Sequence, residues 1–221
     1  VSQGLRLREE LLQLNERISG HRYLRGIIAL GGMRRDLAPA ELIDISTTLK
    51  RVIAEFGEIV DIILSHDIAL NRMQDTGILT LQQAKDLEVV GVAARASGRN
   101  IDVRRDLTYA AYDRVSFAVP VYQAGDVLAR VRVRIDEAAQ SVLIVQQVLE
   151  QMATGPVRIN MPPITTYRRG MGWVESAKGE TVHWLSVGPQ DTVDRYRIRS
   201  ATLSNWPAVP LTVPGNIIPD F

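Results

Sequence analysis

The stretch that decides the fold runs from Asp126 to Pro156 and reads DVLARVRVRIDEAAQSVLIVQQVLEQMATGP. Its apolar residues recur at alternating spacings of three and four, at Leu128, Val131, Ile135, Ala138, Val142, Val145, Leu149 and Met152. This spacing predicts one face of a long helix. Asp126 is suited to cap the start of this helix, and Gly155-Pro156 is suited to end it.

The residues upstream of this stretch predict further helices. Leu7, Leu11, Leu14 and Ile18 form a helical stripe that Gly20 can end. A second long stripe begins near Pro39, with Asp36 as a possible cap, and continues to about His66. Between these two helices, a short apolar run ends in Gly31-Gly32, which predicts a tight turn that a side chain would block.

The segment between the long helices has a different pattern. Thr80 and Gln83 form a capping box that predicts a short helix ending near Leu87. Residues 90–120 show no long periodicity and are rich in arginine. They predict an ordered loop with a short strand near 115–119.

Downstream of Pro156 the pattern changes to short strands. Gly172–Ser176, Thr181–Val187 and Val193–Arg199 are separated by turn residues, which predicts a small antiparallel sheet. We therefore expect an α+β fold, a long-helix bundle followed by a small antiparallel β-sheet. The expected domains are a helical core over 1–156, with the arginine-rich loop at 90–120, and a β-rich subdomain over 157–221.

The composition limits the function. The chain has 221 residues, 46% hydrophobic and 23% charged, with a net charge of +1, which is typical of a globular domain and gives no nucleic-acid footprint. No apolar run approaches the roughly 18 residues of a membrane span. The chain contains no cysteine, so it supplies neither a thiolate metal ligand nor a disulfide. It begins with Val1 rather than methionine, and we expect it to be part of a longer protein.

Two polar segments are candidates for a functional site. The first spans 95–106 and contains Arg95, Ser97, Gly98, Asp102, Arg104, Arg105 and Asp106. It is either a salt-bridge network that fixes the loop between the helices or a polar wall of a buried site. The second places Lys178 on a hairpin turn between Glu175 and Glu180, with His183 further along, which is also the pattern of an ordinary solvated hairpin. We predict no metal ligands, because the histidines lack partners at ligand spacing.

Several motifs in order resemble one enzyme family. They are Gly20-His21-Arg22, Gly31-Gly32-Met33-Arg34-Arg35-Asp36, Arg95 through Asp106 with Tyr109 and Tyr112-Asp113, Gly125-Asp126 through Arg130, Arg134 and Glu137, and Asn205-Trp206-Pro207. Over nearly its whole length the chain resembles the large subunit of energy-converting [NiFe] hydrogenases of the formate hydrogenlyase type. It equally resembles the NuoD-like, 49-kilodalton quinone-site subunit of respiratory complex I.

The resemblance implies a setting for the chain. It implies a long-helix bundle with a peripheral sheet, docked to an iron–sulfur small subunit (NuoB-like) that carries the clusters. Membrane-arm subunits would be indirect partners, and the location would be the cytoplasmic side, peripheral to the membrane. The chain itself would have no transmembrane segment and no nucleic-acid partner.

The resemblance also implies site residues, with two departures from the family. A hydrogenase large subunit holds its Ni–Fe centre on two cysteine pairs, and this chain matches the region between them, with Val213 to Asp220 resembling the segment before the second pair. The hairpin position that is usually arginine over the metal is Lys178, which keeps the charge and loses the planar fork. Lys178 and His183 are the implied catalytic residues.

The leading hypothesis is part of the catalytic large subunit of a membrane-associated oxidoreductase of the [NiFe] hydrogenase type. One alternative is the quinone-site subunit of an NADH-quinone oxidoreductase. A second is a non-catalytic, metal-free structural subunit of a hydrogenase-related complex. We expect this chain alone to hold no cofactor and to be inactive.

Overall fold

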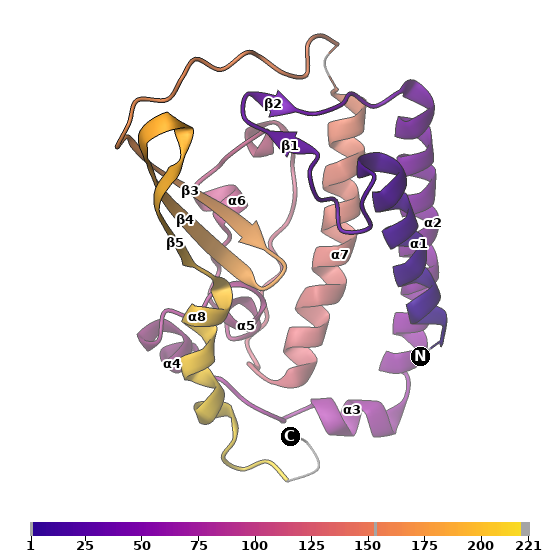
Figure 1. Ribbon diagram of the computed structural model, residues 1–221. Helices are drawn as coiled ribbons and strands as arrows, with labels where there is room; N and C mark the ends of the chain where they lie inside the picture. The colour runs from indigo at the N-terminus through magenta and orange to yellow at the C-terminus, as the bar shows by residue number, and fades with distance from the viewer. Residues whose placement is uncertain (1, 153, 218–221) are drawn as a thin grey trace. The chain divides into compact units, whose positions relative to one another are not determined.

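The computed structural model describes residues 2–152 and 154–217. Its helices are α1 (Ser2–Ser19), α2 (Pro39–Leu64), α3 (Asp67–Met73), α4 (Leu81–Asp86), α5 (Gly91–Ala96), α6 (Val103–Asp106), α7 (Val127–Glu150) and α8 (Ala201–Asn205). Its strands are β1 (Ile28–Ala29), β2 (Gly32–Met33), β3 (Arg169–Ser176), β4 (Gly179–Val187) and β5 (Val193–Arg199). The α+β prediction is confirmed (Figure 1).

The chain forms two compact units, and each is discontinuous in sequence. One comprises the described residues up to Ile63 together with those from Ser141 to Pro162, and the other comprises Leu64–Gln140 and the described residues from Pro163 onward. Helix α7 contributes to both units, so neither unit ends at residue 156. The division into domains at 156 stays a prediction.

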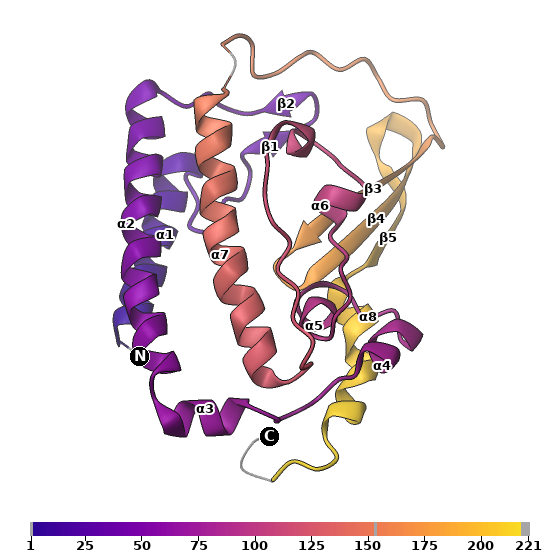
Figure 2. The same ribbon diagram turned by 180° about the vertical axis from the view of Figure 1, so that it is seen from behind.

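The first unit is built on α1 and α2, which lie side by side in both views (Figures 1 and 2). Leu7, Leu12 and Leu14 are buried on α1, and Ile45 and Val52 are buried on α2. Helix α1 ends as predicted, because Gly20 takes a positive φ of 74°. The predicted start of α2 at Pro39 is confirmed.

The cap of α2 differs from the prediction. The Glu41 carboxylate accepts a hydrogen bond of 2.7 Å from the backbone N–H of Ala38. Asp36 accepts instead from the N–H of Leu37, outside the helix. The acid at the third helical position thus supplies the acceptor, as in the second half of a capping box.

The glycine pair forms the predicted tight turn between β1 and β2, which pair antiparallel with Ile28 opposite Met33. A Cβ atom at Gly31 would lie 2.3 Å from the carbonyl oxygen of Ile159, and one at Gly32 would lie 2.2 Å from that of Val157. Both glycines also have positive φ. Side chains are therefore excluded here by contact as well as by backbone conformation.

The second unit contains the antiparallel sheet, with strand order β3-β4-β5. The three predicted strands are confirmed, although β3 begins at Arg169, earlier than expected. Helices α5 and α8 contact β4, and α6 contacts β3. The sheet therefore carries the hairpin turn, Ala177-Lys178, beside the middle segment of the chain.

The prediction for residues 90–120 was partly wrong. The segment contains α5, α6 and a 3-10 helix at Tyr112–Arg114, and no strand forms over 115–119. These helices have six residues or fewer, too short to give a periodic sequence signal. Helix α5 is held by packing, because its Val92 and Ala96 form a buried cluster with Ala129 and Val133 of α7.

Two predicted caps are confirmed in the second unit. Asp126 accepts from the N–H of Ala129 at 2.7 Å and so caps α7, and its other oxygen accepts from the N–H of Asp75. Thr80 and Gln83 form the capping box of α4. Among the described residues, no helix is both long enough and apolar enough to cross a membrane.

Candidate functional site

Arg95 is the centre of a buried ionic network. Its side chain is only 2% exposed, and it forms ion pairs with Glu137 of α7 at 2.6 Å and with Glu175 of β3 at 3.0 Å. It also donates to the carbonyl oxygen of Ile101 at 2.9 Å. A buried guanidinium needs such partners because desolvation of an unpaired charge costs several kcal/mol. Arg95 therefore connects three elements that are distant in sequence.

Asp102 and Arg104 extend this network. Asp102, whose side chain is fully buried, accepts from the N–H of Arg104 and from its guanidinium at 3.0 and 2.6 Å. The guanidinium of Arg104 also lies 4.9 Å from the ring centre of Phe117. Burial opposes the charge on Arg104, yet the hydrogen bond and charge of Asp102 raise its pKa. This pair fixes the start of α6.

Glu175 is the member of the network that belongs to the sheet. Its carboxylate accepts from Arg95 and from the N–H of Val103 at 3.2 Å, and its own N–H donates to Tyr109. Burial raises the pKa of Glu175 and the negative charge of Asp102 adds to this effect, against the opposing charge of Arg95. The network thus joins three carboxyl groups, Asp102, Glu137 and Glu175, to two guanidiniums, Arg95 and Arg104.

The other candidates in the segment 95–106 lie outside this network. Arg105 pairs with Asp106 at the surface. Ser97 is buried, and its hydroxyl has no hydrogen-bond partner among the described residues. A Cβ at Gly98 would lie 2.4 Å from the side-chain oxygen of Gln123. In this segment, Arg95, Asp102 and Arg104 thus form buried ion pairs, whereas the other candidates are either packed against neighbours or exposed to solvent.

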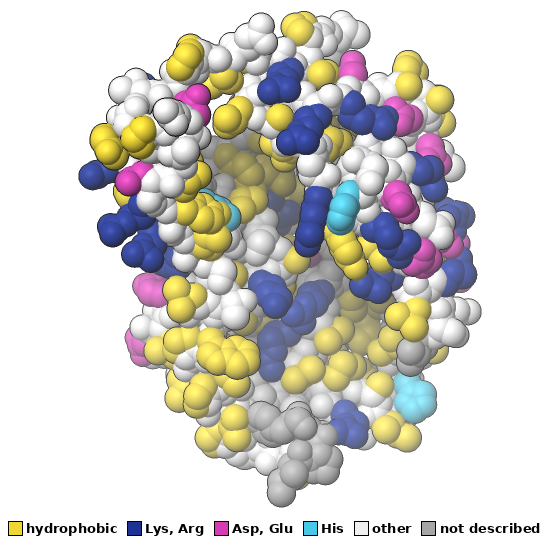
Figure 3. Space-filling model, in the orientation of Figure 1, with side chains coloured by type: hydrophobic (Ala, Val, Ile, Leu, Met, Phe, Trp, Pro, Cys, Tyr) yellow, Lys and Arg dark blue, Asp and Glu magenta, His cyan; other side chains and the backbone are white. Residues whose placement is uncertain are grey.

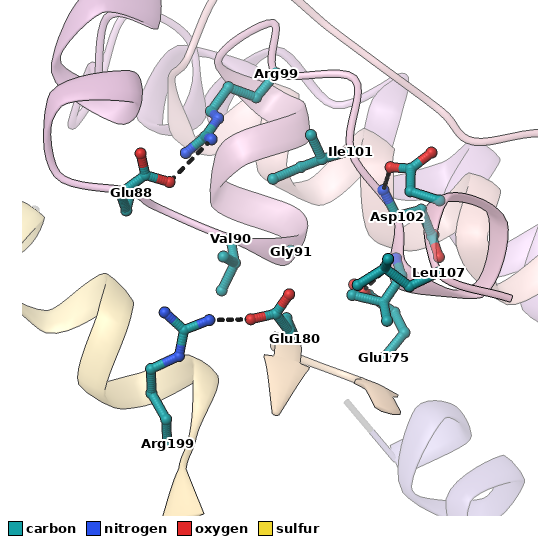
Figure 4. A pocket seen from close by; sticks show the side chains of 12 residues that line it. Glu88, Val90, Gly91, Arg99, Ile101, Asp102, Leu107, Glu175, Glu180 and Arg199 are labelled. Atoms are coloured by element: carbon teal, nitrogen blue, oxygen red, sulfur yellow. Dashed lines mark hydrogen bonds and ion pairs between the residues drawn. The ribbon is translucent and has the colours of Figure 1, made fainter. Parts of the chain in front are cut away.

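A cavity of about 200 Å³ borders the network, and ten of its twelve lining residues are labelled in Figure 4. Glu88 points toward Arg99, and Glu180 points toward Arg199. Every carboxylate that lines this cavity has a guanidinium partner; the five acids are Glu88, Asp102, Asp106, Glu175 and Glu180. Such pairing is typical of a structural network, because a binding site for a charged ligand would contain charged side chains without a partner in the protein.

Lys178 lies at the tip of the β3–β4 hairpin, and its backbone is closely held. A Cβ at Gly91 would lie 2.2 Å from the carbonyl oxygen of Lys178, so α5 and the hairpin meet backbone to backbone. Asn205 donates to that same oxygen at 3.3 Å and exchanges two hydrogen bonds with the backbone of Val90. The side chain of Lys178 is exposed. The fold therefore fixes the backbone from which this exposed side chain extends.

His183 is not brought together with Lys178. It lies in β4, and its Nδ1 is 2.6 Å from the hydroxyl of Tyr196 on β5, with the two rings stacked. It follows the hairpin tip by five positions, or about 16 Å of extended strand. Its joint role with Lys178 stays a prediction.

The chain does not by itself fit a Ni–Fe centre. It has no cysteine, and the described residues contain no group of three or more His, Asp or Glu side chains that could hold a metal ion. The thiolate ligands of such a centre are therefore not in this sequence.

Hydrophobic side chains are exposed among Lys and Arg side chains in the face that Figure 3 shows. Exposed large residues of the second unit include Met171, Tyr196, Ile198 and Trp206, which is 70% exposed.

Comparison with known proteins shows the family to which this fold belongs. Residues 1–171 match the family described as the respiratory-chain NADH dehydrogenase, 49 Kd subunit, and the chain belongs to this family. The family resemblance inferred from the motifs is confirmed.

Its relatives come from two kinds of complex. Formate hydrogenlyase subunit 5 of Escherichia coli (strain K12) is 30% identical over 99% of this chain and 38% of its own length. Hydrogenase-4 component G of the same organism is 29% identical over 99% of this chain and 36% of its own length. NADH-quinone oxidoreductase subunit 4 of Thermus thermophilus is 30% identical over 99% of this chain and 60% of its own length. The chain thus spans less than two thirds of each of these relatives.

Sequence reasoning did not assign a role to Glu137 or Asn205. Glu137 belongs to the α7 stretch that follows Asp126, and only its contact with Arg95 distinguishes it from a solvated acid. Asn205 precedes Trp206-Pro207, a motif used only for recognition, and it ties Lys178 to Val90. The role of each residue depends on a contact with a segment that is distant in sequence. A pattern of neighbouring residues in the sequence does not reveal such a contact.

Proposed function

We propose that the chain is part of the catalytic large subunit of a membrane-associated oxidoreductase of the [NiFe] hydrogenase type. The observation that carries this proposal is Lys178, a cation whose backbone is held by α5 and α8 while its side chain stays exposed. The hydrogenlyase and hydrogenase-4 relatives, each matching 99% of this chain, support this choice.

In this proposal the chain's own residues position charge and move protons. Lys178 presents a positive charge to the reacting centre and can exchange a proton there. The Arg95 network holds β3 against α5, α6 and α7, and so keeps the hairpin tip in place. His183, paired with Tyr196, is a secondary candidate for proton transfer. The metal ligands are assigned to other parts of the protein, because this chain has no thiolate.

The second candidate is the quinone-site subunit of an NADH-quinone oxidoreductase. The family match and the relative from Thermus thermophilus favour it. The lack of a metal-ligating group among the described residues is equally compatible with this role or with a metal-free structural subunit. The three candidates differ in the reaction of the assembled complex.

The partners and location follow from the same proposal. The relatives are named as subunits or components of larger enzymes. We propose an iron–sulfur small subunit (NuoB-like) as the direct partner, with membrane-arm subunits in indirect contact at the cytoplasmic side. Affinity purification of the complete protein from membranes, followed by mass spectrometry, tests this, and recovery without an iron–sulfur subunit would contradict it.

The decisive experiment compares lysine variants in the complete complex. Lys178→Ala should lower hydrogen turnover at least tenfold with assembly intact, and Lys178→Arg should restore a large part of it. Lys85→Ala, at an exposed position of α4, is the matched control. The second candidate would be selected if the native complex reduces quinone but shows no hydrogen turnover, and if Lys178→Ala lowers this quinone reduction. Absence of both activities in the native complex would select the structural subunit.

The chain alone is proposed to be inactive and to carry no nickel or iron. Metal analysis of the purified chain tests this, and stoichiometric nickel would overturn it. The first comparison to make is the encoded sequence on either side of this chain, where two cysteine pairs would support the hydrogenase assignment.

A further inference from the structure

A second cavity, also of about 200 Å³, lies beside Lys178. Its lining comes from α5, α7, the hairpin tip, α8 and the 3-10 helix Trp206–Thr212. We call it the cationic pocket, and its residues are Val92, Ala93, Arg130, Arg134, Lys178, Thr202, Asn205, Trp206 and Val209. All of them belong to the second compact unit.

The cationic pocket has three positive side chains and no carboxylate in its lining. The guanidinium of Arg130 is fixed by the carbonyl oxygens of Gly125 at 2.7 Å and Gly77 at 2.9 Å. Arg134 and the ammonium of Lys178 have no hydrogen bond or ion pair with any residue that the structure describes. Unlike the cavity beside the Arg95 network, this one holds uncompensated charge.

This charge arrangement opposes folding. Arg130 and Arg134 are four residues apart on α7, a spacing at which like charges destabilise a helix. Burial lowers the pKa of Arg130 and the neighbouring charge of Arg134 lowers it further, against the opposing charge of Asp126. A bound anion would relieve both effects.

The remaining walls limit what the anion can be. Val92, Val209 and Trp206 are apolar, and the amide of Asn205 is already occupied by Val90 and the Lys178 carbonyl. Arg134, Lys178 and Trp206 are exposed, so an anion from solution can reach both cations and the indole ring. The volume is below the roughly 300–1,000 Å³ of pockets for drug-sized ligands. A short ligand with one anionic end and an apolar remainder suits these walls.

We propose that the cationic pocket binds a small organic carboxylate, with the carboxylate between Arg134 and Lys178 and the alkyl part against Val92, Val209 and Trp206. Arginine and lysine both pair favourably with carboxylates. The binding does not depend on the redox activity proposed above, although both involve Lys178.

Reductive methylation of the complete protein tests the proposal without measuring turnover. The chain has three lysines, Lys50, Lys85 and Lys178, all exposed, so the first two are internal controls. Methylation by isotopic formaldehyde is quantified by mass spectrometry in butyrate, inorganic phosphate or chloride at equal ionic strength. Butyrate should reduce labelling of Lys178 at least threefold and leave Lys50 and Lys85 unchanged.

Two arginine variants complete the test. Arg134→Gln should abolish protection of Lys178, and Arg132→Gln, outside the pocket on the same helix, should preserve it. Equal protection by chloride, protection by phosphate alone, or protection that survives Arg134→Gln would overturn the proposal. The proposal would also be overturned if Lys178 is not methylated in the absence of any added anion. The same holds if only an acidic segment of a protein partner, and no butyrate, protects Lys178 from methylation.

Discussion

Arg95 and Glu175 are separated by 80 residues in sequence, yet Nη1 of Arg95 lies 3.0 Å from Oε1 of Glu175 with both side chains at most 5% exposed. The contact joins α5 to the strand that leads to Lys178. The position of the hairpin therefore depends on a buried charge pair.

Replacing Arg95 by glutamine should destabilise the protein strongly. Glu175 would keep a buried carboxylate and Glu137 a half-buried one without the guanidinium that both contact, and breaking a buried pair costs about 3–5 kcal/mol. Urea denaturation of the complete protein measures the loss. Arg105→Gln is the control, because this surface pair contributes about 0–1 kcal/mol. Equal losses for both variants would contradict the central position of Arg95.

The pH dependence of stability should change in Glu175→Gln. Because burial raises the folded-state pKa of Glu175, the folded protein binds a proton more tightly than the unfolded chain does. Its contribution to stability is therefore present at low pH and is lost as pH rises from the ordinary glutamate pKa through the raised folded value. Stability of the native protein relative to Glu175→Gln should fall across this window in urea titrations. A constant difference would show that the pKa of Glu175 is the same in the folded and unfolded states.

Gly91→Ala should displace the hairpin tip. The added methyl group would lie 2.2 Å from the carbonyl oxygen of Lys178, and Gly91 has a φ of 67°, which disfavours any side chain. We expect a loss of more than about 1 kcal/mol and faster hydrogen exchange at Gly179. Gly57→Ala, in open space within α2, should instead stabilise its helix by about 0.5–1 kcal/mol.

Asn205→Ala should loosen the same tip without adding bulk. It removes hydrogen bonds to both backbone groups of Val90 and to the carbonyl of Lys178. Hydrogen exchange should increase at Val90, whose N–H loses its acceptor. Asn205→Asp keeps that acceptor and loses the donor, so the Val90 amide should stay protected. Exchange that is identical in the two variants would argue against this role of the amide.

Much of the fold was predictable because its signals are local. The stripe on α7, the cap at Asp126, the capping box at Thr80 and the strands of the hairpin depend on residues a few positions apart. The helices α5 and α6 were missed because each is shorter than the window in which periodicity can be recognised. The sequence indicated the candidate residues as two separate polar segments. It did not indicate that Arg95 and Val103 of the first segment contact Glu175 of the second.

The sequence by itself determined the class of fold, the long helices and their ends, the hairpin and the family, since each follows from short-range patterns or from ordered motifs. Only the tertiary structure decided which charges meet. Arg95 pairs with acids 42 and 80 residues away, whereas Lys178 and Arg134 line one pocket without any acid. Coulomb attraction and desolvation act through space, so only the folded chain distinguishes a compensated arginine from a cation left for a ligand.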